Sequence, residues 1–218
     1  WAICRAWRLD GSSRLLYEGR ISTIELVHET QKRFEVSNEN VAIDSGYATE
    51  RIAHARWKYR KLIRRQGKHV GSSCWVMLKG ARDESFPHHE IHGRQKVKVR
   101  KVYSTTEKRK TSEGKPYSVV KFSNLMAKNA LAAMMAGSRA FGVFTNHSEE
   151  YGAQMQSEAL LEVRPGKWNW ETVNKKGQRA ARVDNHLWDC EVMGVVLASL
   201  RGVLSAGLDD ESIDQETE

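Results

Sequence analysis

Two aspartates occupy positions from which a folded chain could hold a metal ion. Asp44 ends a short apolar run at residues 41–46 (VAIDSG), a pattern that predicts a buried strand followed by a turn. Asp189 lies in an apolar stretch that predicts a helix from about 186 to 204, and counting by three and four residues places it on the apolar face. Because a lone carboxylate is costly to desolvate, Asp189 requires a basic partner or a metal ion nearby.

A strand-end aspartate and a helix aspartate can together serve phosphodiester cleavage. That reaction uses hard oxygen ligands that converge on two divalent ions about 3.5–4 Å apart, and carboxylates supply such ligands. Each residue also has an ordinary explanation, Asp44 as a turn residue that caps the next helix and Asp189 as half of a buried ion pair with an arginine. The presence of both in a basic chain favours the metal site.

A metal site of this kind needs a third acidic ligand, for which the sequence offers several candidates. Glu158 is expected within a helix over residues 148–161. Asp83 and Glu84 closely follow a predicted strand, and Glu50 lies early in a predicted helix. Taken singly, each of these is also explained as an ordinary surface acid.

Histidines offer a weaker signal for metal binding. Residues 87–92 (PHHEIH) would present His88 and His92 on one face if they formed a helix, but the flanking proline and glycine favour a loop. His186, near Asp189, could position water or a phosphate, and its ordinary explanation is a polar residue at a helix N-terminus.

The composition describes a folded, basic body with an acidic end. The chain has 218 residues, 40% of them hydrophobic, which suffices for one domain with a substantial core. Its net charge is +8, but residues 209–218 hold six acids and no base, so the rest of the chain carries +14. Such a body favours a polyanionic partner, with a charge that serves solubility as the alternative. We expect one folded domain over residues 1–207 and a disordered acidic tail over 208–218.

Two stretches concentrate the positive charge. A helix predicted over residues 48–67 carries basic residues and almost no acid, whereas a solvated helix face usually mixes signs. Residues 94–102 alternate basic and apolar, which predicts a strand with one cationic face. Surfaces of one sign favour contact with phosphates. The candidate contacts to double-stranded DNA are Arg51, Lys58, Lys61, Arg64, Arg65, Lys96, Lys98 and Arg100.

The elements around these residues predict a mixed α/β fold with a central sheet and helices on both faces. Strand 41–44, helix 48–67 and strand 74–80 form a βαβ unit, which implies two parallel strands. The other expected elements are a hairpin over 1–21, helices over 23–34, 124–137, 148–161 and 184–207, strands over 117–122, 140–145 and 168–173, and loops over 81–93 and 105–116.

Several classes of site and protein are excluded by absent motifs. The sequence has no Gly-x-x-x-x-Gly-Lys-Ser/Thr run, so it lacks a P-loop for ATP. Its three cysteines have no metal-type spacing and fit a reducing compartment. No apolar run is long enough to cross a membrane and no signal peptide is present, so we expect no membrane partner. A chain that starts at Trp1, directly in strand-like sequence, predicts a piece of a longer protein.

Taken in order, these segments resemble the C-terminal nuclease domain of the large terminase subunits of lambda-like phages or prophages, the motors that package DNA. The matching pieces are Trp7 with residues 11–16 (GSSRLL), residues 41–46, residues 76–80 (VMLKG), Lys128, Tyr151 with residues 154–158 (QMQSE), and residues 185–190 (NHLWDC). The order and approximate spacing fit over most of residues 1–205, and the specificity lies in the ordered series.

The resemblance implies an RNase H-like fold and a metal-dependent endonuclease that cuts concatemeric double-stranded DNA. It implies two Mg²⁺ or Mn²⁺ ions per site, with Asp44, Asp189 and Glu158 as catalytic residues and metal ligands and Asp83 as a further ligand. Family members often carry an aspartate shortly before the lysine that matches Lys128, and no acid stands there in this chain. That departure is what favours Glu158, or the Asp83 and Glu84 pair, as the third ligand.

The resemblance also implies partners and a location. An ATPase domain would precede the nuclease domain, and the small terminase subunit and the portal would join the complex in the cytoplasm of the host cell, outside the mature virion. Two alternatives stay open. One is another RNase H-like nuclease of the resolvase or integrase type, which would prefer branched DNA. The other is a DNA-binding assembly module without catalysis, in which the carboxylates are structural.

Overall fold

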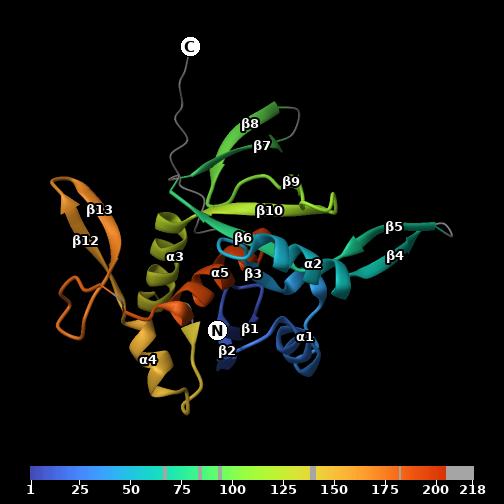
Figure 1. The fold of residues 1–218 in the computed structure, drawn as a ribbon. Coiled ribbons are helices and arrows are strands. Elements are labelled where there is room, and N and C mark those ends of the chain that lie inside the picture. Colours follow the sequence, from blue (N-terminus) through green and yellow to red (C-terminus); the bar gives the residue numbers. More distant parts are fainter. Residues whose placement is uncertain (66–67, 83–84, 93–94, 138–140, 182, 205–218) are drawn as a thin grey trace.

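The computed structural model describes residues 1–65, 68–82, 85–92, 95–137, 141–181 and 183–204, with all of their side chains except those of residues 61–73 and 92. This part of the chain is a mixed α/β architecture of five α-helices and several small sheets (Figure 1). None of the helices described combines the length and the apolar character that crossing a membrane requires.

The N-terminal segment forms the hairpin that its alternating pattern predicts. Strands β1 (Ala2–Trp7) and β2 (Ser13–Gly19) pair antiparallel, and the two-residue strand β11 (Phe141–Gly142) adds to β2 in parallel. Helix α1 (Ile24–Arg33) follows and begins where Thr23 caps it, because the Thr23 hydroxyl accepts a hydrogen bond from a backbone amide of the first turn.

A four-stranded sheet carries the predicted βαβ unit. Its order is β3 (Ala42–Asp44), β6 (Val76–Ala81), β10 (Pro116–Ser123) and β9 (Glu107–Lys110). The first three strands are parallel, and β9 pairs antiparallel with β10. Helix α2 (Thr49–Tyr59) lies between β3 and β6 in the chain, so the parallel pair expected from the sequence is confirmed.

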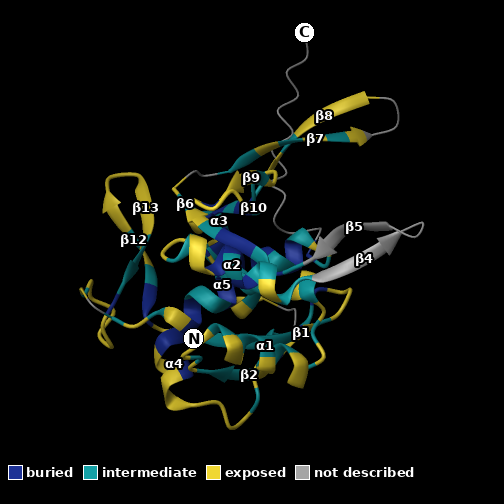
Figure 2. Cartoon of the chain, turned by 45° about the vertical axis from the view of Figure 1, so that its right-hand side comes forward, coloured by how far each residue is buried: buried dark blue, intermediate teal, exposed yellow. Residues whose placement is uncertain are grey.

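Three antiparallel hairpins form separate two-stranded sheets and project from the body in different directions (Figure 1). They are β4 (Lys61–Arg65) with β5 (Lys68–Ser73), β7 (Phe86–His92) with β8 (Gln95–Lys101), and β12 (Glu158–Arg164) with β13 (Lys167–Thr172). The outer part of the β12–β13 hairpin and most of β8 are exposed (Figure 2).

Helix α5 (His186–Leu200) is the centre of the main core. It packs against α3 (Asn124–Ala136), α4 (Glu149–Met155) and β1, and most of its side chains are buried (Figure 2). A short 3-10 turn, η1 (Asn38–Asn40), precedes β3. A second, smaller core lies under α2, where buried side chains of that helix meet β6 and β10.

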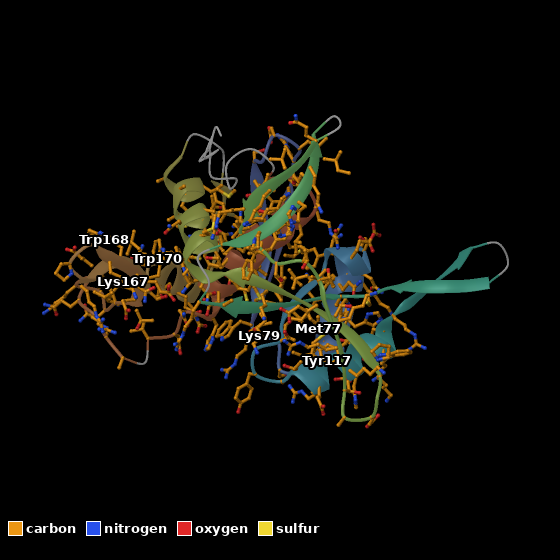
Figure 3. All side chains as sticks on the ribbon, turned by 90° about the horizontal axis from the view of Figure 1, so that it is seen from above. Met77, Lys79, Tyr117, Lys167, Trp168 and Trp170 are labelled. Carbon is orange, nitrogen blue, oxygen red and sulfur yellow. The ribbon has the colours of Figure 1, made fainter. Side chains whose placement is uncertain are left out.

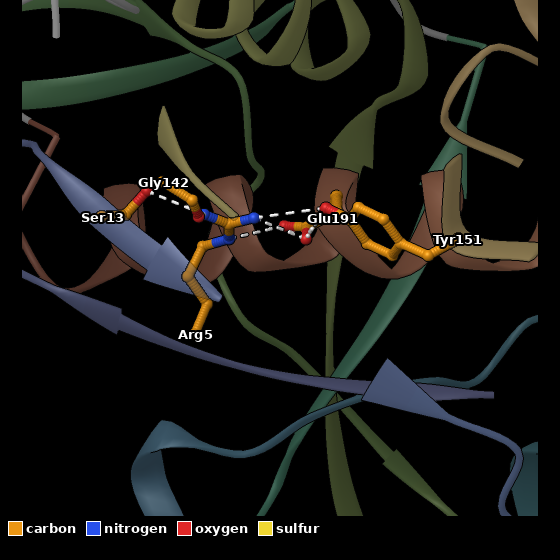
Figure 4. Close-up of polar contacts among 5 residues, drawn as sticks. All are labelled: Arg5, Ser13, Gly142, Tyr151 and Glu191. Atoms are coloured by element: carbon orange, nitrogen blue, oxygen red, sulfur yellow. Dashed lines mark hydrogen bonds and ion pairs between the residues drawn. The ribbon is translucent and has the colours of Figure 1, made fainter. Parts of the chain in front are cut away.

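An ion pair is fully enclosed where β1 meets α5 (Figure 4). The Arg5 guanidinium donates two hydrogen bonds to the Glu191 carboxylate, at 2.8 and 2.7 Å, and the Tyr151 hydroxyl donates a third at 2.8 Å. Arg5 also donates to the Ser13 hydroxyl and the Gly142 carbonyl oxygen. The exposed fractions of the Arg5 and Glu191 side chains are 2% and 0%, so this network joins the N-terminal sheet to the central helix without water.

The structure corrects four of the expected elements. The helix expected over 48–67 ends at Tyr59, because Arg60 is extended and the chain then pairs as β4 and β5. The expected loop over 81–93 contains β7, and that over 105–116 contains β9. The expected central sheet is divided among separate small sheets in the described chain. In the new strands, pairing with the next strand of the chain overrides the helix or loop preference of the single segment.

A further correction concerns the segment that carries Glu158. The helix expected over 148–161 is only α4, which ends at Met155. The residues that follow are Leu- and Val-containing and pair with β13, so Glu158 is the first residue of strand β12.

Candidate metal and phosphate site

The carboxyl ends of three parallel strands define one edge of the four-stranded sheet. Asp44 is the last residue of β3 and lies opposite Leu78 of β6 in the register. Strand β10 ends at the same edge and leads directly into α3. In open parallel sheets this edge is where ligands bind, because loops and helix N-termini meet there.

The turn after Asp44 is held firmly against the sheet. The buried Ser45 hydroxyl donates to the Leu78 carbonyl oxygen at 2.9 Å. The Asp44 carboxylate accepts a hydrogen bond from the Gly46 amide at 2.8 Å, and its side chain is otherwise exposed. Asp44 therefore has the turn role that was its ordinary explanation, and it keeps free oxygen lone pairs for a ligand.

Asp189 lies in the first turn of α5, whose start is fixed by residues from other elements. The Leu187 amide donates to the buried Gln154 side chain at 2.8 Å, so Gln154 of α4 satisfies an amide that a capping residue would otherwise bind. Asn185 is the N-cap residue of α5, but its side chain forms no capping hydrogen bond. Nearly half of the Asp189 side chain, 48%, remains exposed.

Glu158 brings strand β12 to the same place. Its side chain is 3% exposed and both of its oxygens accept hydrogen bonds. The Lys128 ammonium of α3 donates to one at 2.5 Å, and the Asn185 amide donates to the other at 2.6 Å. The Lys128 ammonium also lies 3.8 Å from the Asp189 carboxylate, so one cation sits between two acids.

The pKa of Asp189 reflects its burial and the charged groups around it. Burial raises the pKa of Asp189 from 3.8 to about 6, the Lys128 ammonium opposes that rise, and the charges of Glu158 and Asp44 add to it. Since half of the side chain stays accessible, the repulsion among the carboxylates matters alongside burial.

The structure thus brings two of the acids predicted for the site, Glu158 and Asp189, to one Lys128 ammonium, and the charge of a third, Asp44, acts on Asp189. Glu50 lies elsewhere and accepts hydrogen bonds from the amide and hydroxyl of Ser112. The remaining predicted ligand, Asp83, and its neighbour 84 fall outside the described residues.

The histidines predicted as secondary candidates have structural contacts. His88 lies on strand β7, where its ring contacts Tyr103 edge-on and its Nε2 atom is 2.6 Å from the Tyr103 carbonyl oxygen. The side chain of residue 92 is not described, so the pairing of the two rings is untested. His186 is half exposed and stacks on Trp1, and its charge would act on Asp189.

The predicted DNA contacts divide into three groups. Lys96, Lys98 and Arg100 are exposed on β8, and Arg100 donates to the Ser85 hydroxyl. On α2, Arg51 is exposed and the Lys58 ammonium lies 3.3 Å from a glutamate of α1. The third group lies in β4, where the side chains are not described: Lys61, Arg64 and Arg65.

The acids at the site fit one divalent ion better than two. Among the described residues, no group of three or more His, Cys, Asp or Glu side chains could hold a metal ion as it stands. Mg²⁺ is commonly bound by one or two carboxylates with water and phosphate completing the shell, and Asp44 with Asp189 would meet that need. Glu158 would become a ligand only if the Lys128 ammonium moved away, because both of its oxygens are occupied.

Two charged residues that matter most to the site and its support had a signal in the sequence. Lys128 is the lone charged residue between Asn124 and Ala136, and a single charge in an apolar helix indicates a specific partner. Glu191 shares an apolar helix with Asp189, and it is Glu191 that forms the buried arginine pair proposed as the alternative role of Asp189. Helical counting alone could not rank the burial of two acids so close together.

Comparison with protein-family models, with curated proteins and with solved structures finds no match to this chain.

Proposed function

We propose that the chain is a divalent-metal-dependent DNA endonuclease that hydrolyses phosphodiester bonds. The observation that carries the proposal is the Lys128 ammonium between the Glu158 and Asp189 carboxylates, together with the negative charge of Asp44, which acts on Asp189 from the carboxyl end of β3. The strongly basic body, net +14 without its acidic end, supports a nucleic acid as the substrate.

The residues of the chain divide the work at this site. Asp44 and Asp189 would hold Mg²⁺ or Mn²⁺, which when bound lowers the pKa of water and neutralises charge on a phosphate. The Lys128 ammonium holds the carboxylates together without the ion, and Glu158 fixes the position of that ammonium through an ion pair of 2.5 Å. Asn185 in turn orients Glu158. In its finer form, the proposal adds a second divalent ion in the place now held by the Lys128 ammonium.

The biological setting proposed is genome packaging, on the strength of the sequence resemblance to phage terminases. The three parallel strands β3, β6 and β10, with Asp44 at one end, support an RNase H-like topology as the finer description of the fold. In that setting the partners would be a packaging ATPase domain, a small terminase subunit and a portal, in the host cytoplasm.

A second candidate is a DNA-binding assembly module without catalysis. It is favoured by one observation, that both oxygens of Glu158 already accept strong hydrogen bonds, as expected of a structural ion pair. In that case the basic surfaces would bind DNA and added metal would change nothing.

The test is cleavage of supercoiled plasmid by the chain with Mn²⁺, Mg²⁺ or EDTA. We expect nicked and linear products with either metal and none with EDTA, because the carboxylates provide no reaction path without the ion. A four-way junction in parallel separates a packaging nuclease from a resolvase, which would prefer the branched substrate. Neither cleavage nor a metal-induced rise in melting temperature would favour the binding module.

Metal affinity is expected to fall as the pH drops below about 6. The pKa of Asp189, about 6, lies above its ordinary 3.8, so at pH 5 the carboxyl group carries a proton that it must lose to bind a cation. One such proton weakens the apparent affinity about tenfold for each pH unit below the pKa. The measurement is the Mn²⁺-induced rise in Tm between pH 5 and 8.

The control is Asp189→Asn, in which the Mn²⁺-induced rise in Tm should be small at every pH because one of the two proposed ligands is gone. A Tm rise that stays constant from pH 8 to 5 in the unsubstituted chain would place the ion away from Asp189.

A further inference from the structure

The hairpin of β12 and β13 is anchored to the candidate site at its base. Its first residue, Glu158, is one of the site carboxylates, and the Val173 amide donates to the Ser157 carbonyl oxygen just below it. The indole N–H of Trp170 donates a hydrogen bond to the side-chain oxygen of Asn129 in α3 at 2.8 Å. The Trp170 ring also packs against Trp188 of α5, with the ring centroids 5.3 Å apart. The direction of the hairpin is therefore fixed by the two helices that position Lys128 and Asp189.

One face of this hairpin leads from the site to its tip. In the register Glu158 lies opposite Thr172, Leu160 opposite Trp170, and Glu162 opposite Trp168. Opposite residues share a face, and so do residues two apart, so Glu158, Trp170 and Trp168 lie on one face in order. From the Glu158 and Thr172 pair to Trp168 is about 13 Å along the strand.

The tip of the hairpin exposes an aromatic ring on this face, and positive charge lies around the tip, because Lys167 is the strand neighbour of Trp168. Trp168 is 53% exposed, and Figure 3 shows it with Lys167 on the projecting hairpin. Arg164 lies opposite Lys167 at the turn, and within the described chain neither forms an ion pair. The nearest acid on the same face, Glu162, accepts a hydrogen bond from the Gly166 amide and so helps to shape the turn.

An exposed indole with two exposed cations at the same hairpin tip matches the chemistry of nucleic-acid strands. Aromatic side chains stack on bases, and lysine and arginine bind phosphates. Bases inside an intact duplex are stacked on each other and offer no face to an indole, whereas unpaired bases do. A distance of about 13 Å corresponds to about four base pairs of duplex.

We propose that the β12–β13 hairpin is a strand-binding arm, in which Trp168 stacks on an unpaired base and Arg164 and Lys167 hold the adjoining phosphates. The proposal rests on the proposed nuclease function for the place where the DNA lies. It adds a substrate preference, namely DNA with unpaired bases about four positions from the phosphate that is cut.

The test is binding of fluorescently labelled oligonucleotides, measured by anisotropy in EDTA, so that no cleavage occurs. One DNA is a blunt duplex and the other carries an unpaired flank of about six nucleotides. For Trp168→Ala we expect the Kd for the flanked duplex to rise about 5- to 150-fold, the usual loss for one stacked base, with little change for the blunt duplex. Trp168→Phe should retain most of the affinity because it keeps an aromatic face.

Leu160→Ala is the matched control, since Leu160 is 39% exposed on the same face but has no ring to stack. It should bind both DNAs as the unsubstituted chain does. The double variant Arg164→Gln and Lys167→Gln should weaken binding and reduce its salt dependence without any loss of folding, because both residues are exposed.

The outcomes separate this proposal from the nuclease proposal. Equal binding of flanked DNA by Trp168→Ala and the unsubstituted chain overturns the strand-binding arm, even if plasmid cleavage is observed. Loss of flanked binding in Trp168→Ala and its retention in Trp168→Phe supports the arm, even if no metal produces cleavage. Should Trp168→Ala fail to fold, the double variant decides, and unchanged binding by it overturns the proposal.

Discussion

Asp44→Asn and Asp189→Asn are each expected to lower metal-dependent plasmid cleavage about a thousandfold or more. Each substitution keeps the shape of the side chain and removes one of the two charges proposed to hold the ion, which supplies several kcal/mol of transition-state stabilisation. DNA binding in EDTA should stay within about twofold, because phosphate contacts come mainly from the basic surfaces. The measurement is the initial rate of nicking of supercoiled plasmid with saturating Mn²⁺.

The stability of Asp189→Asn gives an independent check on this assignment. The folded-state pKa of about 6 lies above 3.8, so above pH 6 the ionised carboxylate opposes folding. An amide has no such charge, and the Tm of the variant at pH 7.5 without metal should equal or exceed that of the unsubstituted chain. A loss of activity with a raised Tm identifies a residue kept for function at the expense of stability.

Asp184→Asn is the matched control for both substitutions. Asp184 lies just before α5 and is 76% exposed, with only a loose 3.8 Å contact to His186. Its variant should cut at the rate of the unsubstituted chain. Full activity in Asp44→Asn or Asp189→Asn would remove the proposed ligands and with them the nuclease assignment.

The second large effect is expected on stability, from the enclosed pair of Arg5 and Glu191. Removing one partner leaves an uncompensated charge in a place without water, which costs about 3–5 kcal/mol. We therefore expect Glu191→Ala and Arg5→Ala each to lower the free energy of unfolding by about that amount. Urea unfolding at pH 7.5 followed by circular dichroism measures the change.

The double variant Arg5→Met with Glu191→Leu should lose much less than the sum of the single losses, because an apolar pair replaces both charges. Lys58→Ala is the matched control. This substitution breaks the ion pair between Lys58 and Glu25, whose side chains are both more than half exposed. It should lower the free energy of unfolding by less than about 1 kcal/mol. A loss below about 1 kcal/mol for Glu191→Ala would contradict the view that this network ties the N-terminal sheet to the central helix.

The sequence alone predicts much of the local structure around Asp44. The apolar run that ends at Asp44 and the run before Gly80 each have the length of a strand, and the helix between them requires a parallel pair. The helices expected from residues 23, 124 and 148 begin within one residue of those positions, where Thr23, Ser123 and Ser148 cap them. These features depend on residues close together in the chain, so local chemistry determines them.

Elements that pair through their backbones were harder to predict. The basic segment after Tyr59 has a helical composition, and the segment from Glu158 continues a helical pattern, yet both form hairpins. A strand is stabilised by its partner as much as by its own residues, so the composition of one segment did not reveal the hairpin, although the partner is the next segment of the chain. The RNase H-like topology stays a prediction, since it concerns how strands far apart in the chain are ordered.

The sequence by itself determined which residues have the chemistry for a metal site: Asp44, Asp189 and Glu158 are named by type, position and resemblance alone. Only the tertiary structure decided that they meet, that Lys128 lies between Glu158 and Asp189, and that Glu191 rather than Asp189 forms the buried pair with arginine. The physical reason is that burial and Coulomb interaction depend on distances in space. Lys128 is 30 positions from Glu158 and 61 from Asp189 in the chain, and Arg5 is 186 positions from Glu191. Packing around α5 sets those distances, and no local pattern encodes them.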